Sequence, residues 1–457
     1  MATQQTDFSQ GSVKRRILAQ ALPLTLAQAV QLLYNIVDRI FIGRLPGEGD
    51  LALTGLGITF PVIVIIAAFT SLFGTGGMTL FSIARGKRDE NEAEGILGNV
   101  FALLAISAAV LFVFCYALRR PILFAFGASE QSFSYADQYL KIYLFGTAFS
   151  MFSTGLNGYI NAQGFPRIGM LTTVIGALTN VVLDPIFIFT LDLGVAGASI
   201  ATAISKIVSF SILLFPYVTK RSMLHLSIRN FHPTASILTQ IVTVGSSSMF
   251  RSLLAVVAGI MLNDLAGNIS DSVLAGIGVT TKIMMFPFSI ILGFGSGFQP
   301  VAGFNWGAKR YDRVRESYRF SSIVALVGAS AMALFVAIFA NPIITAFAGT
   351  DPQMQEIGAL CIRLQCLALP IHAWVAVVNM FCVGLGNARG AFLLATARQG
   401  SCFIPILYPL AFLFDAYGVA ASQALADVLT LILAVPIIIK MLKKVSEAEK
   451  ALAAENQ

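Results

Sequence analysis

An amide, a carboxylate and a proline lie close together in one strongly apolar stretch, Asn180-Val-Val-Leu-Asp184-Pro185. Asn180 and Asp184 are four residues apart, so a helix would place both side chains on one face. Pro185 has no backbone N–H, which leaves the carbonyl of Val181 without its helical partner beside the carboxylate. The run therefore predicts a local polar site inside an otherwise apolar helix.

Two other apolar stretches carry side chains that could complete this site. One contains Asp38, and the other carries Thr202 and Lys206, which are four residues apart. Burial disfavours the charge of a carboxylate, so these groups suit a proton carrier. Carboxylate, amide and hydroxyl oxygens could instead hold Na⁺. A structural ion pair of Lys206 with Asp184 or Asp38 is the third interpretation.

The second half of the chain carries more cations than anions inside its apolar stretches. For Arg251, Lys282 and Arg363 we favour interhelical pairing or carbonyl capping over substrate contact. His372 could relay protons, but packing with a satisfied ring is favoured. Asp427 has no evident partner in the sequence.

The sequence predicts neither a disulfide scaffold nor a metal centre. Its five cysteines fall within or at the ends of apolar segments, where small thiols pack as buried free side chains. No Cys-x-x-Cys or His/Cys cluster is present, so we expect no metal or other cofactor, apart from the Na⁺ interpretation above.

Composition places these residues in a membrane protein. Of 457 residues, 56% are hydrophobic and only 12% charged, and the mean hydropathy is +0.79. Soluble domains carry about 25% charged residues. The net charge of +7 is spread over short stretches between apolar runs rather than gathered in one patch, which argues against nucleic acid as a partner.

Apolar runs of about 20 residues or more predict twelve membrane-spanning helices. With the N-terminus inside, 20 Lys and Arg fall in inside segments and 3 in outside segments, which predicts that both termini are cytoplasmic. The spans are expected at roughly 18–42, 52–82, 96–118, 137–160, 168–190, 197–218, 236–262, 273–303, 319–340, 357–383, 390–413 and 418–439.

The chain also repeats itself at a nearly constant offset. Gly55-Leu-Gly57-Ile-Thr59 recurs as Gly276-Ile-Gly278-Val-Thr280, and Phe73-Gly74-Thr75-Gly76 recurs as Phe294-Gly295-Ser296-Gly297. A duplicated six-helix unit predicts an all-α membrane protein with two pseudo-symmetric lobes, related by an axis along the membrane normal. We place the N-terminal lobe at 1–219, a cytoplasmic linker at 220–235 and the C-terminal lobe with its tail at 236–457.

Three motifs resemble the multidrug and toxic compound extrusion (MATE) family. They are Gln31-Leu-Leu-Tyr34-Asn35-Ile-Val-Asp38, the run from Asn180 to Ile188, and Gly194-Val-Ala-Gly197-Ala before Ala201-Thr202. The resemblance covers nearly the whole chain and is closest to the DinF-like and MepA-like bacterial branches. It implies a twelve-helix antiporter that exports amphipathic, often cationic, drugs in exchange for H⁺ or Na⁺.

The resemblance also implies which residues do the work. The family's coupling site falls on Asp38, Asn180, Asp184 and Thr202. Its substrate cavity falls on Gln31, Tyr34, Tyr139 and Asn157, to which we add Lys206 and the adaptable side chain of Met284.

Two departures from the family bear on the coupling ion. The NorM-like branch has a carboxylate in its seventh helix, where this chain has Arg251, so a cation site in the C-terminal lobe is not expected. Lys206 stands where a close relative would have an apolar residue. A fixed positive charge beside the carboxylates disfavours Na⁺, which favours H⁺ coupling.

Other functions remain as alternatives. A lipid-linked oligosaccharide flippase of the same superfamily would use a cationic cavity. Lys206, Arg251 and Lys282 could supply its positive charge, so this function stays an alternative. A major facilitator carrier shares the six-plus-six plan, but its charged loop after the second helix is poorly matched here. No nucleophile elbow, phosphate loop or metal triad indicates an enzyme. We expect a monomer in the bacterial cytoplasmic membrane, surrounded by lipid, that transports small drug-like molecules.

Overall fold

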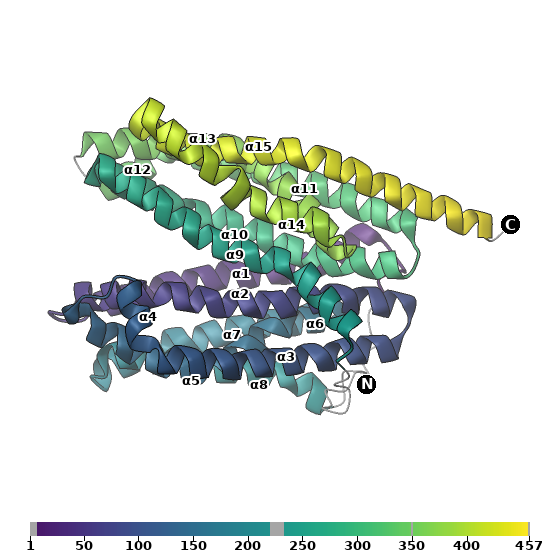
Figure 1. Ribbon diagram of the computed structural model, residues 1–457, viewed down its shortest axis with the longest axis horizontal. Helices are drawn as coiled ribbons and strands as arrows, with labels where there is room; N and C mark the ends of the chain where they lie inside the picture. Colours follow the sequence, from purple (N-terminus) through teal and green to yellow (C-terminus); the bar gives the residue numbers. More distant parts are fainter. Residues whose placement is uncertain (1–6, 220–232, 349–350, 456–457) are drawn as a thin grey trace. The chain divides into compact units, whose positions relative to one another are not determined.

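The computed structural model describes residues 7–219, 233–348 and 351–455, which are almost entirely helical (Figure 1). The first half contains α1 (Val13–Gly43), α2 (Gly49–Lys87), α3 (Glu90–Ala117), α4 (Arg119–Ala125), α5 (Glu130–Gly155), α6 (Asn157–Ala162), α7 (Pro166–Pro185), the π-helical turn η1 (Ile186–Thr190) and α8 (Gly194–Val218). The second half contains α9 (Ala235–Ile269), α10 (Asp271–Gly307), α11 (Tyr311–Ile338), α12 (Ala340–Ala348), α13 (Pro352–Gly384), α14 (Ala388–Thr396), η3 (Ala397–Ser401) and α15 (Phe403–Glu455).

The twelve predicted spans are present within the described residues. Ten helical segments are long and apolar enough to cross a membrane. The last of them, Ala388–Glu455, is 68 residues long and kinks at Asp415, where the backbone is not helical (φ 53°, ψ −131°), so it makes two spans. The remaining predicted span corresponds to α5, which has 26 residues and is not one of those ten segments.

The described chain divides into two compact units. Unit 1 consists mainly of Leu26–Gly245, and unit 2 of Phe8–Thr25 with Ser246–Gln457. The first turns of α1 therefore belong to unit 2, and the first turns of α9 belong to unit 1. The lobe boundaries predicted from the sequence stay a prediction, and nearly all of the predicted 220–235 linker lies outside the described residues.

Close glycine contacts hold the first turns of α1 and α9 in place. In unit 1, a side chain at Gly76 would collide with the backbone of Ile241 and Gly245 on α9. In unit 2, a side chain at Gly297 would collide with the backbone of Ala21 on α1. Gly76 and Gly297 are equivalent positions of the sequence repeat, so each copy uses the same glycine to admit a helix at close range.

The internal repeat is visible in backbone detail as well as in sequence. Arg88 and Lys309 both adopt left-handed conformations just after a long helix, with φ of 62° and 56°. The Asn157 Nδ2 amide donates to the carbonyl of Gly169 at 2.9 Å, and Asn379 donates to the carbonyl of Ala391 at 2.8 Å. Both bonds span twelve residues at equivalent places, so the two copies share local structure.

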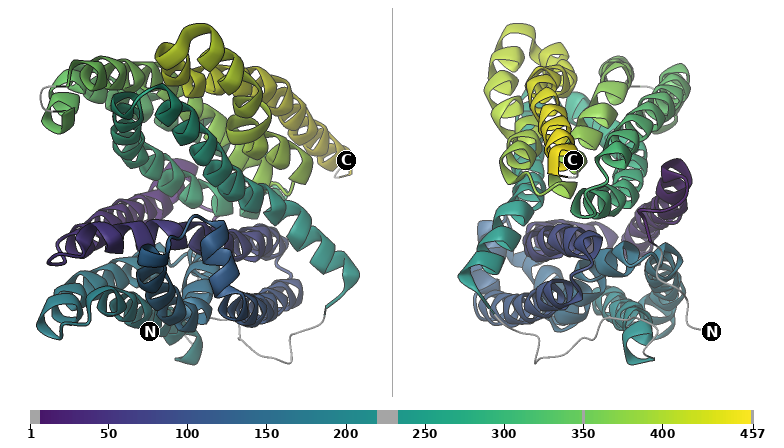
Figure 2. Two further views of the ribbon diagram at one scale, coloured as in Figure 1. Left: turned by 60° about the vertical axis from the view of Figure 1, so that its left-hand side comes forward. Right: turned by 90° about the vertical axis from the view of Figure 1, so that its right-hand side faces the viewer.

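Each unit packs its helices side by side (Figure 2). In unit 1, α5 lies against α2 and α8, and in unit 2, α13 lies against α10, α11 and α15. Large apolar side chains that face outward are common, among them Val113, Leu334 and Phe412. This surface suits a hydrocarbon surrounding, because lipid replaces water around the spans.

Candidate functional site

A buried polar cluster in unit 1 brings together the four predicted coupling residues. Asp38 comes from α1, Asn180 and Asp184 from α7, and Thr202 from α8. The Asn180 Nδ2 lies 3.2 Å from the Asp184 Oδ1 and 3.4 Å from the Thr202 Oγ1. Asn180 and Asp184 are fully buried, while Thr202 and Asp38 are 4% and 8% exposed.

The two carboxyl groups of this cluster interact directly. Asp38 and Asp184 lie within hydrogen-bonding range of each other, although they are 146 residues apart in the chain. Two ionised carboxylates at this range would repel, whereas one shared proton turns the contact into a hydrogen bond. Such a contact can share one proton between α1 and α7.

Three oxygens of the cluster are left available for another ligand. Asp38 Oδ1, Asn180 Oδ1 and Asp184 Oδ2 are buried and have no hydrogen-bond partner in the part of the chain that the structure describes. A proton on either carboxyl group, or a cation held between the oxygens, would satisfy them. The donor set thus fits both of the ions that the sequence left open.

Local sequence explains why the site forms on α7. Its buried face follows a helical spacing through Gly169, Thr172, Gly176, Asn180 and Asp184. After Pro185 the chain continues as the π-helical turn η1. Such turns disturb the regular hydrogen-bond ladder and are frequent at functional sites. The proline and the turn together keep unpaired backbone polarity close to the Asp184 carboxyl.

An aromatic wall adjoins the acidic pair. Tyr139 is 4% exposed, and its ring stacks on Tyr143 with centroids 6.1 Å apart. Tyr139 also interacts with the hydroxyl of Thr202, which ties α5 to the site. Tyr143 was not predicted from the sequence, although its position four residues after Tyr139 could have indicated it.

Lys206 lies over an aromatic ring of α1 and, within the described chain, not beside a carboxylate. Its Nζ lies 5.9 Å from the centroid of the Tyr34 ring. The hydroxyl group of Tyr34 forms a hydrogen bond with the side chain of Gln31. No ion pair joins Lys206 to Asp38 or Asp184 among the described residues. The third interpretation from the sequence, an ion pair with either aspartate, is therefore not the arrangement in this structure.

Two predicted cavity residues have other surroundings. Asn157 is half-buried and satisfied locally, because its amide donates to Gly169 and its oxygen accepts from Asn161 at 2.8 Å. Met284 is fully buried in unit 2. Neither observation tests substrate contact, so both assignments stay predictions.

Unit 2 supplies partners that the sequence did not reveal. The Arg398 Nε donates to the Asp427 Oδ1 at 2.6 Å, so Asp427 has a cationic partner. The Arg363 Nη2 donates to the Asn341 side chain at 3.0 Å, in agreement with the predicted polar pairing. Arg398 and Asp427 are 29 residues apart, too far for a local spacing to predict their pair.

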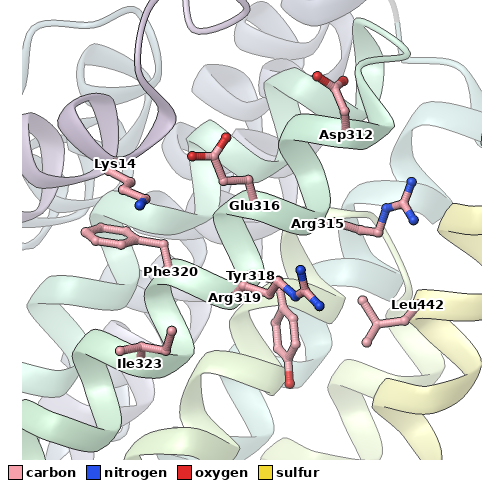
Figure 3. A pocket seen from close by; sticks show the side chains of 9 residues that line it. All are labelled: Lys14, Asp312, Arg315, Glu316, Tyr318, Arg319, Phe320, Ile323 and Leu442. Carbon is pink, nitrogen blue, oxygen red and sulfur yellow. The ribbon is translucent and has the colours of Figure 1, made fainter.

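A pocket of about 680 Å³ opens in unit 2, separate from the acidic cluster (Figure 3). Its wall carries both charged side chains, such as Lys14 and Arg319, and apolar ones, such as Ile323 and Leu442. None of the residues that line it belongs to the predicted site. The full lining is Lys14, Asp312, Arg315, Glu316, Tyr318, Arg319, Phe320, Ile323 and Leu442.

The duplicated spans and the buried acidic pair define a class of protein, a multi-pass membrane transporter. The MatE family model matches residues 23–186 and 247–409, one segment in each half of the chain. The chain belongs to the MATE family, as its motifs predicted. Its place in a family of transporters, not enzymes, agrees with the function class expected from the sequence.

Individual relatives agree over nearly the full length. The chain is 25% identical over 445 residues to the multidrug export protein MepA of Staphylococcus haemolyticus, covering 97% of each sequence. A crystal structure of a MATE transporter in complex with MaL6 superposes with a TM-score of 0.90 at 23% identity, covering 98% of this chain and all of the other. A Vibrio cholerae MATE transporter, VcmN, superposes with a TM-score of 0.88 at 21% identity over 96% of this chain and 99% of the other. These structures confirm the predicted fold.

Proposed function

We propose that this protein is a secondary multidrug antiporter that exports amphipathic organic compounds, cationic ones among them, in exchange for H⁺. The observation that carries the proposal is the buried contact between Asp38 and Asp184, which offers a proton a place between two helices. The relative from Staphylococcus haemolyticus bears the name of a multidrug export protein, which supports the substrate class.

The residues suggest how a proton could drive the cycle. When the cluster faces the outside, a proton enters between Asp38 and Asp184 and removes their repulsion. The protonated pair draws α1 towards α7. This movement shifts Tyr34 relative to Tyr139 and releases the substrate. When the cluster faces the inside, the proton leaves, and the negative charge again favours loading of a cationic substrate.

Sodium and lipid-linked sugar are the alternatives. The same free oxygens could coordinate Na⁺, while Lys206 adds a positive charge nearby that disfavours a second cation. Export of a lipid-linked oligosaccharide would instead use Lys206, Arg251 and Lys282. We place the protein in the bacterial cytoplasmic membrane as a monomer with both termini inside, on the strength of its charge distribution.

The test is drug-induced proton movement in proteoliposomes with an acidic lumen and a trapped pH-sensitive dye. Adding a cationic drug outside should drive drug inward and protons outward, so the lumen becomes more alkaline. We expect Asp184→Asn and Asp38→Asn each to lower the initial rate of proton movement at least tenfold. In each variant only one carboxyl group remains, so the two side chains can no longer share and release a proton as a pair. Asp264→Asn is the matched control, since that carboxylate is exposed on α9.

Three results would contradict the proposal. Normal proton movement in Asp184→Asn would remove the acidic pair from the coupling step. Drug uptake that follows a Na⁺ gradient and ignores the proton gradient would assign the site to Na⁺. Stimulation by a lipid-linked oligosaccharide, with no drug-linked ion flux, would favour the flippase.

A further inference from the structure

A second cluster of ionisable side chains lies inside unit 2, where the proposed coupling mechanism assigns no role. Arg398 and Asp427 form its centre, with the Arg398 Nε 2.6 Å from the Asp427 Oδ1. The His372 Nδ1 lies 3.8 Å from the same oxygen, too far for a hydrogen bond. The side chains of Arg398, His372 and Asp427 are 15%, 14% and 5% exposed, so the cluster is largely shielded from its surroundings.

The cluster retains donors that Asp427 does not use. Arg398 Nη2 and His372 Nδ1 are buried and have no hydrogen-bond partner within residues 7–219, 233–348 and 351–455. Phe288 fixes both groups, since the Arg398 Cζ lies 4.6 Å from its ring centroid and His372 meets the same ring edge-on at 4.9 Å. A buried guanidinium N–H held in a fixed position without a partner can bind an acceptor, and His372 Nδ1 can donate beside it in the tautomer that carries its hydrogen there.

Arg251 adds a second guanidinium from α9. It lies on the inward face of that helix, four residues after buried Ser247 and seven before buried Ala258. Leu254, one turn later, packs near Gly400 of η3, the turn that carries Arg398. The charge of Arg251 acts on His372, so it belongs to the same cluster. No hydrogen bond or ion pair joins Arg251 to any other residue in the described part of the chain.

The charges of this cluster do not balance. The cluster contains two guanidinium groups, of which only Arg398 is paired with the one carboxylate, whereas the unit 1 site has two carboxylates in contact. An uncompensated buried charge is costly, and charged side chains inside a membrane mark substrate or ion pathways. An arginine fork matches the geometry of a carboxylate or phosphate, so an acidic group is the ligand that would satisfy the unused donors.

We propose that Arg251, Arg398 and His372 bind the acidic group of amphipathic substrates, so that the transporter prefers compounds bearing a carboxylate or phosphate over their neutralised counterparts. The proposal rests on the transport function proposed above and defines the substrate class more closely. The Phe288 ring gives the site an apolar side against which the body of such a compound packs. A zwitterion can satisfy this cluster and still carry a positive group.

The experiment compares rhodamine B, which has a free carboxylate, with its ethyl ester, which does not. Fluorescence anisotropy measures binding of each dye to the full-length protein in nanodiscs. We expect the acid to bind wild type at least tenfold more tightly than the ester. Arg251→Met should reduce this ratio to about one, mainly by weakening the acid. Lys282→Met is the matched control, because it removes an exposed cation from the same unit and should keep the ratio.

Two further variants separate folding and coupling from anion binding. Replacing Arg398 alone would leave Asp427 buried and unpaired, so the double change Arg398→Leu with Asp427→Leu removes the pair together. It should also abolish the preference for the acid. Asp184→Asn should lose proton movement and keep the preference, which distinguishes failure of the coupling proposal from failure of this one. Equal affinities in wild type, or an unchanged ratio in Arg251→Met, would overturn the anion site.

Discussion

At the scale of single residues, the two units differ in the sign of the charge they bury. Unit 1 brings Asp38 against Asp184, and unit 2 pairs Arg398 with Asp427 and places Arg251 near His372. Lys206 of unit 1 is a partly buried cation as well, and it lies over Tyr34 without an ion pair in the described chain. If the proposed cavity lies against this ring, Lys206 would repel a cationic substrate without neutralising the acidic pair.

Removing this charge should therefore favour cations. We expect Lys206→Met to bind a permanently cationic aromatic dye about tenfold more tightly than wild type, because a unit charge at close range contributes about 1.4 kcal/mol or more in a partly buried setting. Anisotropy titrations in nanodiscs measure the effect. Lys206→Arg keeps the charge and should keep wild-type affinity. A neutral dye that gained equally from Lys206→Met would show that steric access, not charge, controls binding.

Sequence reasoning reached the residues of the first site but not all their contacts. Asn180 and Asp184 could be placed on one helix face because their spacing is local. The approach of Asp38 to Asp184 depends on how α1 packs against α7, which local spacing does not specify, and there the family resemblance supplied the association. Neither a local spacing nor a family motif indicated the Arg398–Asp427 pair. It forms only because η3 packs against α15 in the folded protein.

At the scale of helices, glycines decide how closely the elements pack. Gly74 of α2 faces Gly155 of α5, and an added Cβ at Gly74 would lie 3.0 Å from the backbone of Gly155. This close contact shows that the glycine serves helix packing. The kink at Asp415 was harder to foresee, because a left-handed non-glycine residue has no strong signature of its own.

Enlarging Gly74 should separate these helices. We expect Gly74→Leu to lower the free energy of unfolding by about 1–3 kcal/mol, the usual cost of overpacking. The midpoint of thermal unfolding in detergent should fall by about 2–10 °C. Gly57→Leu is the matched control on the same helix, because nothing lies within 4 Å of a Cβ added at Gly57. Equal losses in both variants would mean that helix propensity or lipid exposure, not the α2–α5 contact, sets the effect.

At the scale of the whole molecule, duplication made the fold the most predictable property of the chain. A constant offset between glycine motifs specified two copies, and apolar run lengths specified the spans in each. Neither the repeat nor the apolar run lengths predict that the first turns of α1 belong to unit 2 and those of α9 to unit 1. This arrangement depends on the backbone contacts at Gly76 and Gly297, which only three-dimensional packing reveals.

Orientation in the membrane follows from charge and can be tested with single cysteines. All five native cysteines are buried, so the background reaction with a membrane-impermeant maleimide should be low. In intact cells we expect Arg44→Cys to be labelled, and Lys87→Cys and Lys443→Cys to be labelled only after the membrane is opened. Lys87 and Lys443 are 49% and 76% exposed, so folding does not hide either position. Ten predicted spans separate them, an even number that returns the chain to the same side. Opposite labelling of these two sites would refute the twelve-span count, and protection of Arg44→Cys with labelling of both lysine positions would reverse the orientation.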